Sequence, residues 1–202
     1  DSNRTIQWTN YVPSSANSYV FETIEEPSGD LVITASSLGG TFNVFLRRYT
    51  AGGVASLPTT FHSDASHADA GIRIIPAHGG GYLVAGVYGN YGSYDPWLLR
   101  VNHSLDTLWT KKLPGMFDQQ QLWQKDYSVV STANGYLLCG GSNNSGSKDV
   151  RLIKVDTTGN VVWSQFHGTT SDDICVELIN TADHHIAACG YTIDTNNQQN
   201  IL

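Results

Sequence analysis

The sequence is poor in charge, since only 14% of its 202 residues are Asp, Glu, Lys or Arg. Soluble domains typically carry about a quarter of charged residues. Basic residues are fewer than acidic ones, 11 against 18, which gives a net charge of −7. Because nucleic acids and anionic membrane surfaces are bound through clusters of Lys and Arg, this balance argues against both partners. The surface must be covered mainly by Ser, Thr, Asn, Gln and Gly, a composition that favours an extracytoplasmic β-protein.

Long apolar runs are missing as well. No stretch approaches the roughly 20 residues of a membrane span, and no run of useful length has helical periodicity. The chain opens on Asp1 without a signal peptide or methionine, so we expect that a leader has been removed or the sequence trimmed. These features favour an exported protein built from strands.

Cysteine is scarce, and its odd count of three argues against a disulfide framework or a zinc ribbon. Cys139 and Cys189 each end an apolar run, where a buried free thiol behaves as a small hydrophobic side chain. Cys175 and Cys189 flank a predicted hairpin turn and could form a cross-strand disulfide. We favour free thiols, because a bridge between adjacent strands demands tight geometry.

A six-residue run recurs along the chain at a step of about fifty residues, which is the range of known repeat architectures. Residues 81–86 read Gly-Tyr-Leu-Val-Ala-Gly, and residues 135–140 read Gly-Tyr-Leu-Leu-Cys-Gly. Weaker copies stand at 30–35 and 185–190. The sequence is therefore built from about four repeats.

Three further elements accompany each run. An apolar element follows it, at 43–49, 95–101 and 149–155, and starts again at residue 200. A Trp element comes next, clear at Trp109 and Trp163, well matched at Trp8 and poorly matched by 55–57. A β-branched element precedes the Gly-Tyr run, at 19–24, 71–75, 127–130 and 174–179. Turn residues separate these elements, so each repeat is predicted to be a four-stranded antiparallel meander.

One such sheet cannot bury both of its faces alone, and radial packing of neighbouring sheets gives the blades of a propeller. We therefore expect an all-β fold, a β-propeller or partial propeller of about four four-stranded antiparallel blades. It would form a single domain over residues 1–202, with repeats at approximately 5–54, 55–106, 107–160 and 161–202. A pair of small sandwiches is the competing architecture, but it does not require quarter-length copies.

The copy from Asp149 to Gly190 carries the clearest signature. Residues 154–164 read Lys-Val-Asp-Thr-Thr-Gly-Asn-Val-Val-Trp-Ser, and residues 168–173 read Gly-Thr-Thr-Ser-Asp-Asp. This pattern resembles a bacterial β-propeller repeat family with Gly-Asp-Asp before the first strand and Gly-Asn-x-x-Trp before the last. The resemblance covers nearly the whole chain and implies a propeller in a secreted protein or surface lipoprotein, with no catalytic residues. The first two copies depart from the pattern, with Asn17 in place of the second Asp and Leu57 in place of Trp.

The chain stops at Leu202 inside an expected third strand, and it begins with a lone Trp strand over residues 5–12. In many propellers an N-terminal strand completes the last blade, so a closed four-bladed ring is one alternative. We expect instead a chain truncated at its C-terminus, with a larger ring and room for further domains of the same parent chain.

Acidic residues recur just before the first strand of three repeats, at Asp69, Asp126 and Asp173, with Asn17 in the fourth place. First strands line the central channel of a propeller, so these carboxylates could converge and hold calcium through oxygen ligands. The preferred alternative is that each Asp accepts backbone hydrogen bonds in its own turn or from the next blade. We therefore expect no cofactor, with calcium as the exception that a carboxylate ring would allow.

Three tyrosines, Tyr88, Tyr91 and Tyr94, lie in one Gly-containing segment predicted to be a loop. Flat aromatic rings on such a loop could stack on sugars or anchor a protein partner. Packing between blades is the alternative, and it is the role expected for Trp97. The histidine pairs His62–His67 and His184–His185 lack metal-binding motifs, and they and His78 are expected to be solvated loop residues.

No nucleophile motif, P-loop or dinucleotide fingerprint is present, and neighbouring acids such as Asp172 and Asp173 point to opposite faces of a strand. We expect a non-enzymatic exported or cell-surface module that binds a protein or carbohydrate partner through its loops. A structural scaffold within a larger surface assembly is the first alternative. An enzyme with its site over the central channel is the second, and it requires polar residues from several blades to converge there.

Overall fold

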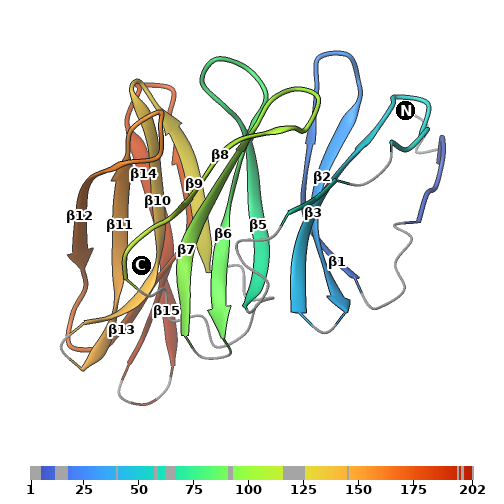
Figure 1. Cartoon of the computed structure of the whole chain (residues 1–202). Coiled ribbons are helices and arrows are strands. Elements are labelled where there is room, and N and C mark those ends of the chain that lie inside the picture. Colours follow the sequence, from blue (N-terminus) through green and yellow to red (C-terminus); the bar gives the residue numbers. More distant parts are fainter. Residues whose placement is uncertain are drawn as a thin grey trace.

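The computed structural model describes residues 6–11, 18–39, 41–56, 59–61, 67–90, 93–115, 126–144, 146–194, 196 and 198–201. The described residues form four antiparallel sheets, named A to D in chain order (Figure 1). Sheet A contains β1 (Ser18–Glu25), β2 (Leu31–Gly39), β3 (Thr41–Tyr49) and β4 (Thr59–Phe61). Sheet B contains β5 (Ala68–Pro76), β6 (Tyr82–Asn90), β7 (Ser93–Val101) and β8 (Thr107–Lys112). Sheet C contains β9 (Tyr127–Thr132), β10 (Gly135–Asn144), β11 (Ser147–Val155) and β12 (Val161–His167), and sheet D contains β13 (Asp172–Asn180), β14 (Ile186–Ile193) and β15 (Gln199–Ile201).

Each sheet is a meander in which consecutive strands pair, because short turns join them. In the β1–β2 turn, the Gly29 amide donates to the Glu26 carbonyl at 2.8 Å, and Gly29 has φ +85°. The β11–β12 turn has the same form, with a 3.1 Å bond from Gly159 to Asp156. Glycine suits these positions because it adopts positive φ without a steric penalty.

The sheets pack face to face in chain order, so sheets B and C have a neighbour on each side. In Figure 1, sheet A lies on one side of sheet B, and sheets C and D lie on the other. The central strands β6 and β10 are therefore buried almost along their length, which explains why both read as continuous apolar runs. Tyr82 and Val84 pack toward sheet A, whereas Leu83 and Ala85 pack toward sheet C.

The predicted all-β fold with four antiparallel units is confirmed, although the described part of sheet D has three strands rather than four. Among the described residues, no helix has the length and hydropathy needed to cross a membrane.

Two sequence predictions of strand position are wrong. Residues 6–11, inside the expected N-terminal Trp strand, form no strand; instead Trp8 stacks on Tyr49, and its indole N–H donates to the Ala51 carbonyl at 3.0 Å. The fourth strand of sheet A is β4, beyond the expected 55–57 element, where only Ala55 forms an isolated bridge with Tyr49. The two deviations fall in the first two repeats, which are also the copies that depart most from the repeat pattern.

The first strands β1, β5, β9 and β13 contact one another in sequence order. Three of them, β1, β5 and β13, contain a β-bulge at the same repeat position. The bulges lie between Val20 and Glu22, between Gly71 and Arg73, and between Cys175 and Glu177. Because a bulge re-aims the side chain that follows it, this irregularity positions the polar residues described below.

Gly86 is a sensitive point of the repeat. A Cβ atom at this position would lie 1.8 Å from the Ala70 carbonyl oxygen on the paired strand. We expect Gly86→Ala to lower the free energy of unfolding by about 3 kcal/mol, because backbone within a packed sheet cannot move aside. Urea unfolding followed by tryptophan fluorescence measures the change.

Gly52→Ala is the matched control, since the nearest atom to its new Cβ would be the Thr50 hydroxyl at 3.9 Å. Its unfolding free energy should change by less than about 0.5 kcal/mol. Equal effects of the two substitutions would contradict the close approach of β5 to β6.

Candidate functional site

One polar residue from each first strand occupies the same repeat position. These residues are Glu22 on β1, Arg73 on β5, Ser128 on β9 and Glu177 on β13. Their partners on the second strands also occupy one repeat position, and they are Thr34, Ala85, Cys139 and Cys189. In the three bulged strands, this is the first residue that pairs again after the bulge. The repeat thus brings four chemically different side chains to one place.

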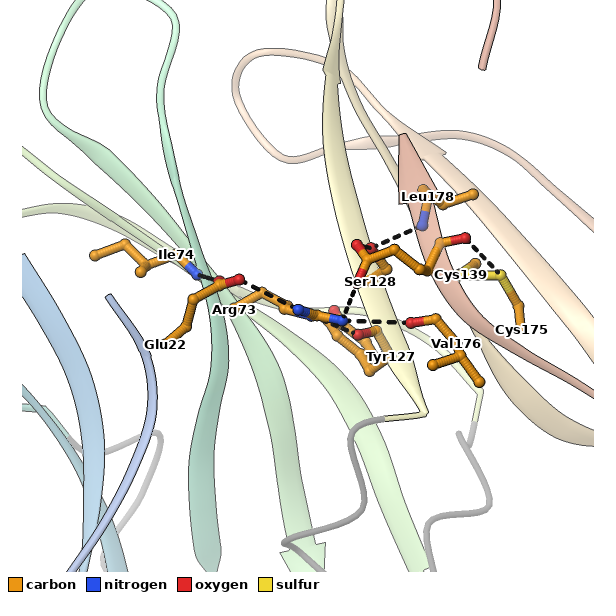
Figure 2. A network of polar contacts seen from close by, with 10 residues as sticks. Glu22, Arg73, Ile74, Tyr127, Ser128, Cys139, Cys175, Val176 and Leu178 are labelled. Carbon is orange, nitrogen blue, oxygen red and sulfur yellow. Dashed lines mark hydrogen bonds and ion pairs between the residues drawn. A yellow bond between two sulfur atoms is a disulfide. The ribbon is translucent and has the colours of Figure 1, made fainter. Parts of the chain in front are cut away.

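Arg73 is the centre of this cluster (Figure 2). Its Nε donates to the Tyr127 carbonyl at 2.8 Å, and its Nη1 bonds to Glu22 Oε1 at 3.2 Å. Its Nη2 bonds to Glu177 Oε2 at 2.6 Å and to the Val176 carbonyl at 3.3 Å. One guanidinium on sheet B therefore contacts sheets A, C and D.

The two carboxylates are fully engaged. Glu22 Oε2 accepts the Ile74 amide at 2.6 Å, and Glu177 Oε1 accepts the Ser128 hydroxyl at 2.7 Å. The Ser128 oxygen in turn accepts the Leu178 amide at 3.0 Å. All four carboxylate oxygens thus have a partner, so the cluster is suited to holding sheets together rather than to acid–base chemistry.

A disulfide joins sheets C and D beside this network. Cys139 on β10 is bonded to Cys175 on β13, with 6.0 Å between the Cα atoms, whereas Cys189 is free and exposed. The expectation of free thiols at Cys139 and Cys175 is therefore wrong, and so is the alternative pairing of Cys175 with Cys189. The bond crosses between sheets, where the tight geometry of adjacent strands does not apply.

A groove opens between the β9–β10 and β13–β14 hairpins, with a volume of about 450 Å³. Its lining residues are mostly small and polar: Ser131, Thr132, Ala133, Asn180, Thr181, His184 and Ile186. The Asn180 amide donates to the Ser131 carbonyl at 3.1 Å and ties the two hairpins together. The Asn180 amide and the Thr132 and Thr181 hydroxyls are already hydrogen-bonded within the protein, so apolar atoms make up most of the surface that the groove presents.

Hydrogen bonds brace the two hairpins, one of them from the neighbouring strand β11. Lys154 Nζ donates to the Thr132 hydroxyl at 2.6 Å, and the Thr181 hydroxyl donates to the His185 carbonyl at 3.0 Å. His184, at the tip of the second hairpin, has φ +65°, which turns the chain back into β14. The groove is therefore built on short, hydrogen-bonded turns.

The predicted tyrosine loop is largely strand. Tyr94 lies on β7 and is only 2% exposed, so the expectation that its ring is available to a ligand is wrong. Tyr88 lies on β6, half-buried, where its hydroxyl donates to Asp95 at 3.2 Å and Lys112 lies over its ring. Tyr91 lies outside the described residues. The cause is that β6 and β7 extend further than their apolar runs indicated.

The three predicted carboxylates have separate surroundings. Asp173 is buried and accepts the amide and hydroxyl of Thr169 in its own turn, at 2.5 and 2.9 Å. Asp126 accepts the Tyr191 hydroxyl from sheet D at 3.3 Å, and Asp69 is buried on β5. Within the described part of the chain, no three acidic, histidine or cysteine side chains are placed to hold a metal ion. The arrangement of Asp173 matches the hydrogen-bonding alternative, whereas the partner of Asp126 is a side-chain hydroxyl of sheet D rather than a backbone N–H.

The contact between Asp126 and Tyr191 perturbs both groups. Burial raises the pKa of the Asp126 carboxyl, while the hydrogen bond from Tyr191 lowers it by a smaller amount. Burial and the charge of Asp126 raise the pKa of the Tyr191 phenol to about 12. The neutral forms of both groups are therefore favoured at the junction of sheets C and D.

The histidines differ from one another. His78 donates its backbone amide to the Tyr136 hydroxyl at 3.0 Å and packs edge-on against that ring, so the expectation of a solvated residue is wrong there. The His67 ring contacts Tyr88, and His62 lies outside the described residues. His184 and His185 are exposed, as expected for a hairpin turn.

Sequence reasoning missed the network around Arg73 and the role of Cys139. The signal was present, because the four network residues stand at one position of the aligned first strands. Compared with protein-family models and with curated proteins, the sequence finds no match in either.

Arg73→Met tests the network. It removes the guanidinium and leaves two carboxylates close together with unpaired carbonyls, so we expect the free energy of unfolding to fall by about 2–3 kcal/mol. This expected loss of unfolding free energy is smaller than for a fully buried ion pair, because the Glu177 side chain is 40% exposed and water screens its charge. Chemical denaturation measures it.

Arg73→Lys serves as the comparison, since it keeps the charge but cannot reach several acceptors at once. We expect Arg73→Lys to lower the free energy of unfolding by less than Arg73→Met does. A change below about 0.5 kcal/mol for Met would show that the sheets are held together without the network.

Asp126→Asn tests the buried carboxyl. A carboxyl whose pKa is raised on folding contributes stability at low pH that is lost as pH rises through the folded pKa. The ionised aspartate therefore destabilises the folded state at neutral pH, and the neutral amide should not. We expect the variant to be more stable than the unmodified chain at pH 7, and the difference to vanish at pH values below the ordinary range of an aspartate. Thermal melts of both chains across this pH range measure the difference. A variant that is no more stable than the unmodified chain at pH 7 would show that burying the Asp126 charge costs little.

Proposed function

We propose that this chain is part of an exported β-propeller of the bacterial repeat type and acts as a non-enzymatic module that binds a protein or carbohydrate partner. The groove between the β9–β10 and β13–β14 hairpins carries the proposal. It is a concave surface formed by two turns at the end of two packed sheets, and binding sites are commonly found on turns that such a scaffold positions.

The polar centre supports a binding rather than a catalytic role. An enzyme would need a nucleophile or an acid–base pair free to meet substrate, whereas Glu22 and Glu177 use all their oxygens in holding Arg73, Ile74 and Ser128. Because these hydrogen bonds join the sheets, they also favour the second candidate function, a structural scaffold whose sheets keep a fixed geometry.

The Cys139–Cys175 disulfide supports an extracytoplasmic location, because such bonds persist in oxidising compartments. The acidic net charge of −7 supports a partner other than nucleic acid. The composition and the bond together fit a secreted or surface-exposed protein.

A glycan array and a pull-down with the immobilised chain test the proposal. Ala133→Trp fills the groove from an exposed turn position, and we expect it to weaken binding of any captured partner at least tenfold, about 1.4 kcal/mol. Ser28→Trp, on the corresponding turn of sheet A, is the matched control and should bind normally.

Tyr88→Ala separates the groove from the tyrosine segment, because Tyr88 lies on β6 of sheet B and not in the groove. Failure to capture any protein or glycan would favour the scaffold. Capture that is indifferent to Ala133→Trp would place the binding surface elsewhere and reject the groove.

A further inference from the structure

A buried tyrosine ring fills two of the three junctions between neighbouring sheets. Tyr82 on β6 packs toward sheet A, and Tyr136 on β10 packs toward sheet B. Ile186 stands at the same repeat position on β14, as the pairing of each second strand with its first strand shows, and it packs toward sheet C. The junction of sheets C and D therefore has a short aliphatic side chain where the other two junctions have a phenol ring.

The preceding sheet supplies the partners of each tyrosine hydroxyl. The Tyr82 hydroxyl donates to the Glu26 carboxylate of sheet A and accepts from Arg48 Nη2 at 2.9 Å. The Tyr136 hydroxyl accepts the His78 amide of sheet B at 3.0 Å. Each ring is thus held by the turn between the first and second strands of the preceding sheet, and one of them also by a basic side chain on the third strand of that sheet.

The groove between the β9–β10 and β13–β14 hairpins lies at the equivalent place of the third junction. Thr132 and Ala133, which line it, stand at the repeat positions of Glu26 and His78. Ile186 lines it from sheet D. The groove is therefore enclosed by the equivalents of the residues that surround a tyrosine at the other junctions, and its volume of about 450 Å³ admits an aromatic ring.

Lys154 supplies a polar partner at the edge of the groove. It stands on β11 at the repeat position of Arg48, which donates to Tyr82. Its Nζ donates to the Thr132 hydroxyl at 2.6 Å and to the Val155 carbonyl at 3.1 Å. Because an ammonium group has three donors, these two bonds to described residues leave the third for a hydroxyl oxygen in the groove.

We infer that the groove takes the side chain of a tyrosine presented by a partner protein, with the ring against Ile186 and Ala133 and the hydroxyl near Lys154. This inference rests on the proposed function and narrows the partner to a protein. A sugar would need many free polar groups, whereas apolar atoms make up most of the groove surface, and Asn180 and Thr181 are already hydrogen-bonded. A flat ring with a single hydroxyl matches an apolar site with a single available donor.

Titration of the full 202-residue chain with N-acetyl-tyrosinamide tests the inference. The methyl NMR signals of Ala133 and Ile186 should shift with a dissociation constant on the order of 1 mM, as expected for a ligand of this size. N-acetyl-phenylalaninamide lacks only the hydroxyl and should bind about fivefold more weakly, since one hydrogen bond is lost. N-acetyl-leucinamide should cause no shift at the same concentrations. Absence of shifts, or equal binding of the tyrosine compound and either of the others, overturns the inference.

Two variants locate the ring. Ile186→Tyr places the chain's own ring in the groove, and we expect it to weaken binding of N-acetyl-tyrosinamide at least about tenfold, measured at the Ala133 methyl. Ile179→Tyr is the matched control, because Ile179 is exposed on β13 and does not line the groove, and it should bind normally. Equal loss in both variants overturns the inference. Lys154→Met should abolish the preference for tyrosine over phenylalanine while the ring still binds.

The pull-down separates the failure of this inference from the failure of the proposed function. Capture of a protein that is lost in Ala133→Trp and is competed by N-acetyl-tyrosinamide supports both. Capture of a glycan through the groove supports the proposed function and overturns the tyrosine inference. Methyl shifts with the tyrosine compound, without capture of any partner, support the inference and count against the binding module.

Discussion

The guanidinium of Arg73 is the one group in the described structure that contacts all four sheets. It stands on sheet B, pairs with Glu22 of sheet A and Glu177 of sheet D, and donates to the Tyr127 carbonyl of sheet C. The apolar clusters join sheets A and B, sheets C and D and, through Phe21, sheets A, B and C, so none of them includes all four sheets. A planar guanidinium with acceptors on three other sheets limits how far those sheets can shift relative to one another.

Packing between sheets follows a single rule with local variations. Each junction places the second strand of one sheet against the first strand of the next, and the pair of residues in contact changes from polar to apolar to covalent along the chain. Nearest-neighbour contacts of this kind make stability an approximate sum over junctions. On sheet D, Ala187 and Cys189 occupy positions of this kind and are exposed.

The Gly-Tyr runs predicted the central strands well, because only strands covered on both faces can be continuously apolar. The segment around Tyr94 was predicted poorly, since glycines and tyrosines occur both in exposed loops and in the extended ends of long strands. The groove at the hairpin end could not be predicted, because Ser131 and Asn180 approach each other only through the packing of sheet D on sheet C.

The sequence by itself determined the repeat: four units, their strand order and the equivalence of positions such as Cys139 and Cys189, since periodicity and turn residues are local properties. Only the tertiary structure decided which equivalent residues meet. Cys139 is bonded to Cys175 because a further sheet packs on β10, while Cys189 is exposed because the described residues place no sheet on β14. Contacts between sheets depend on curvature and on register across a face, and neither is encoded in the spacing of residues along a single repeat.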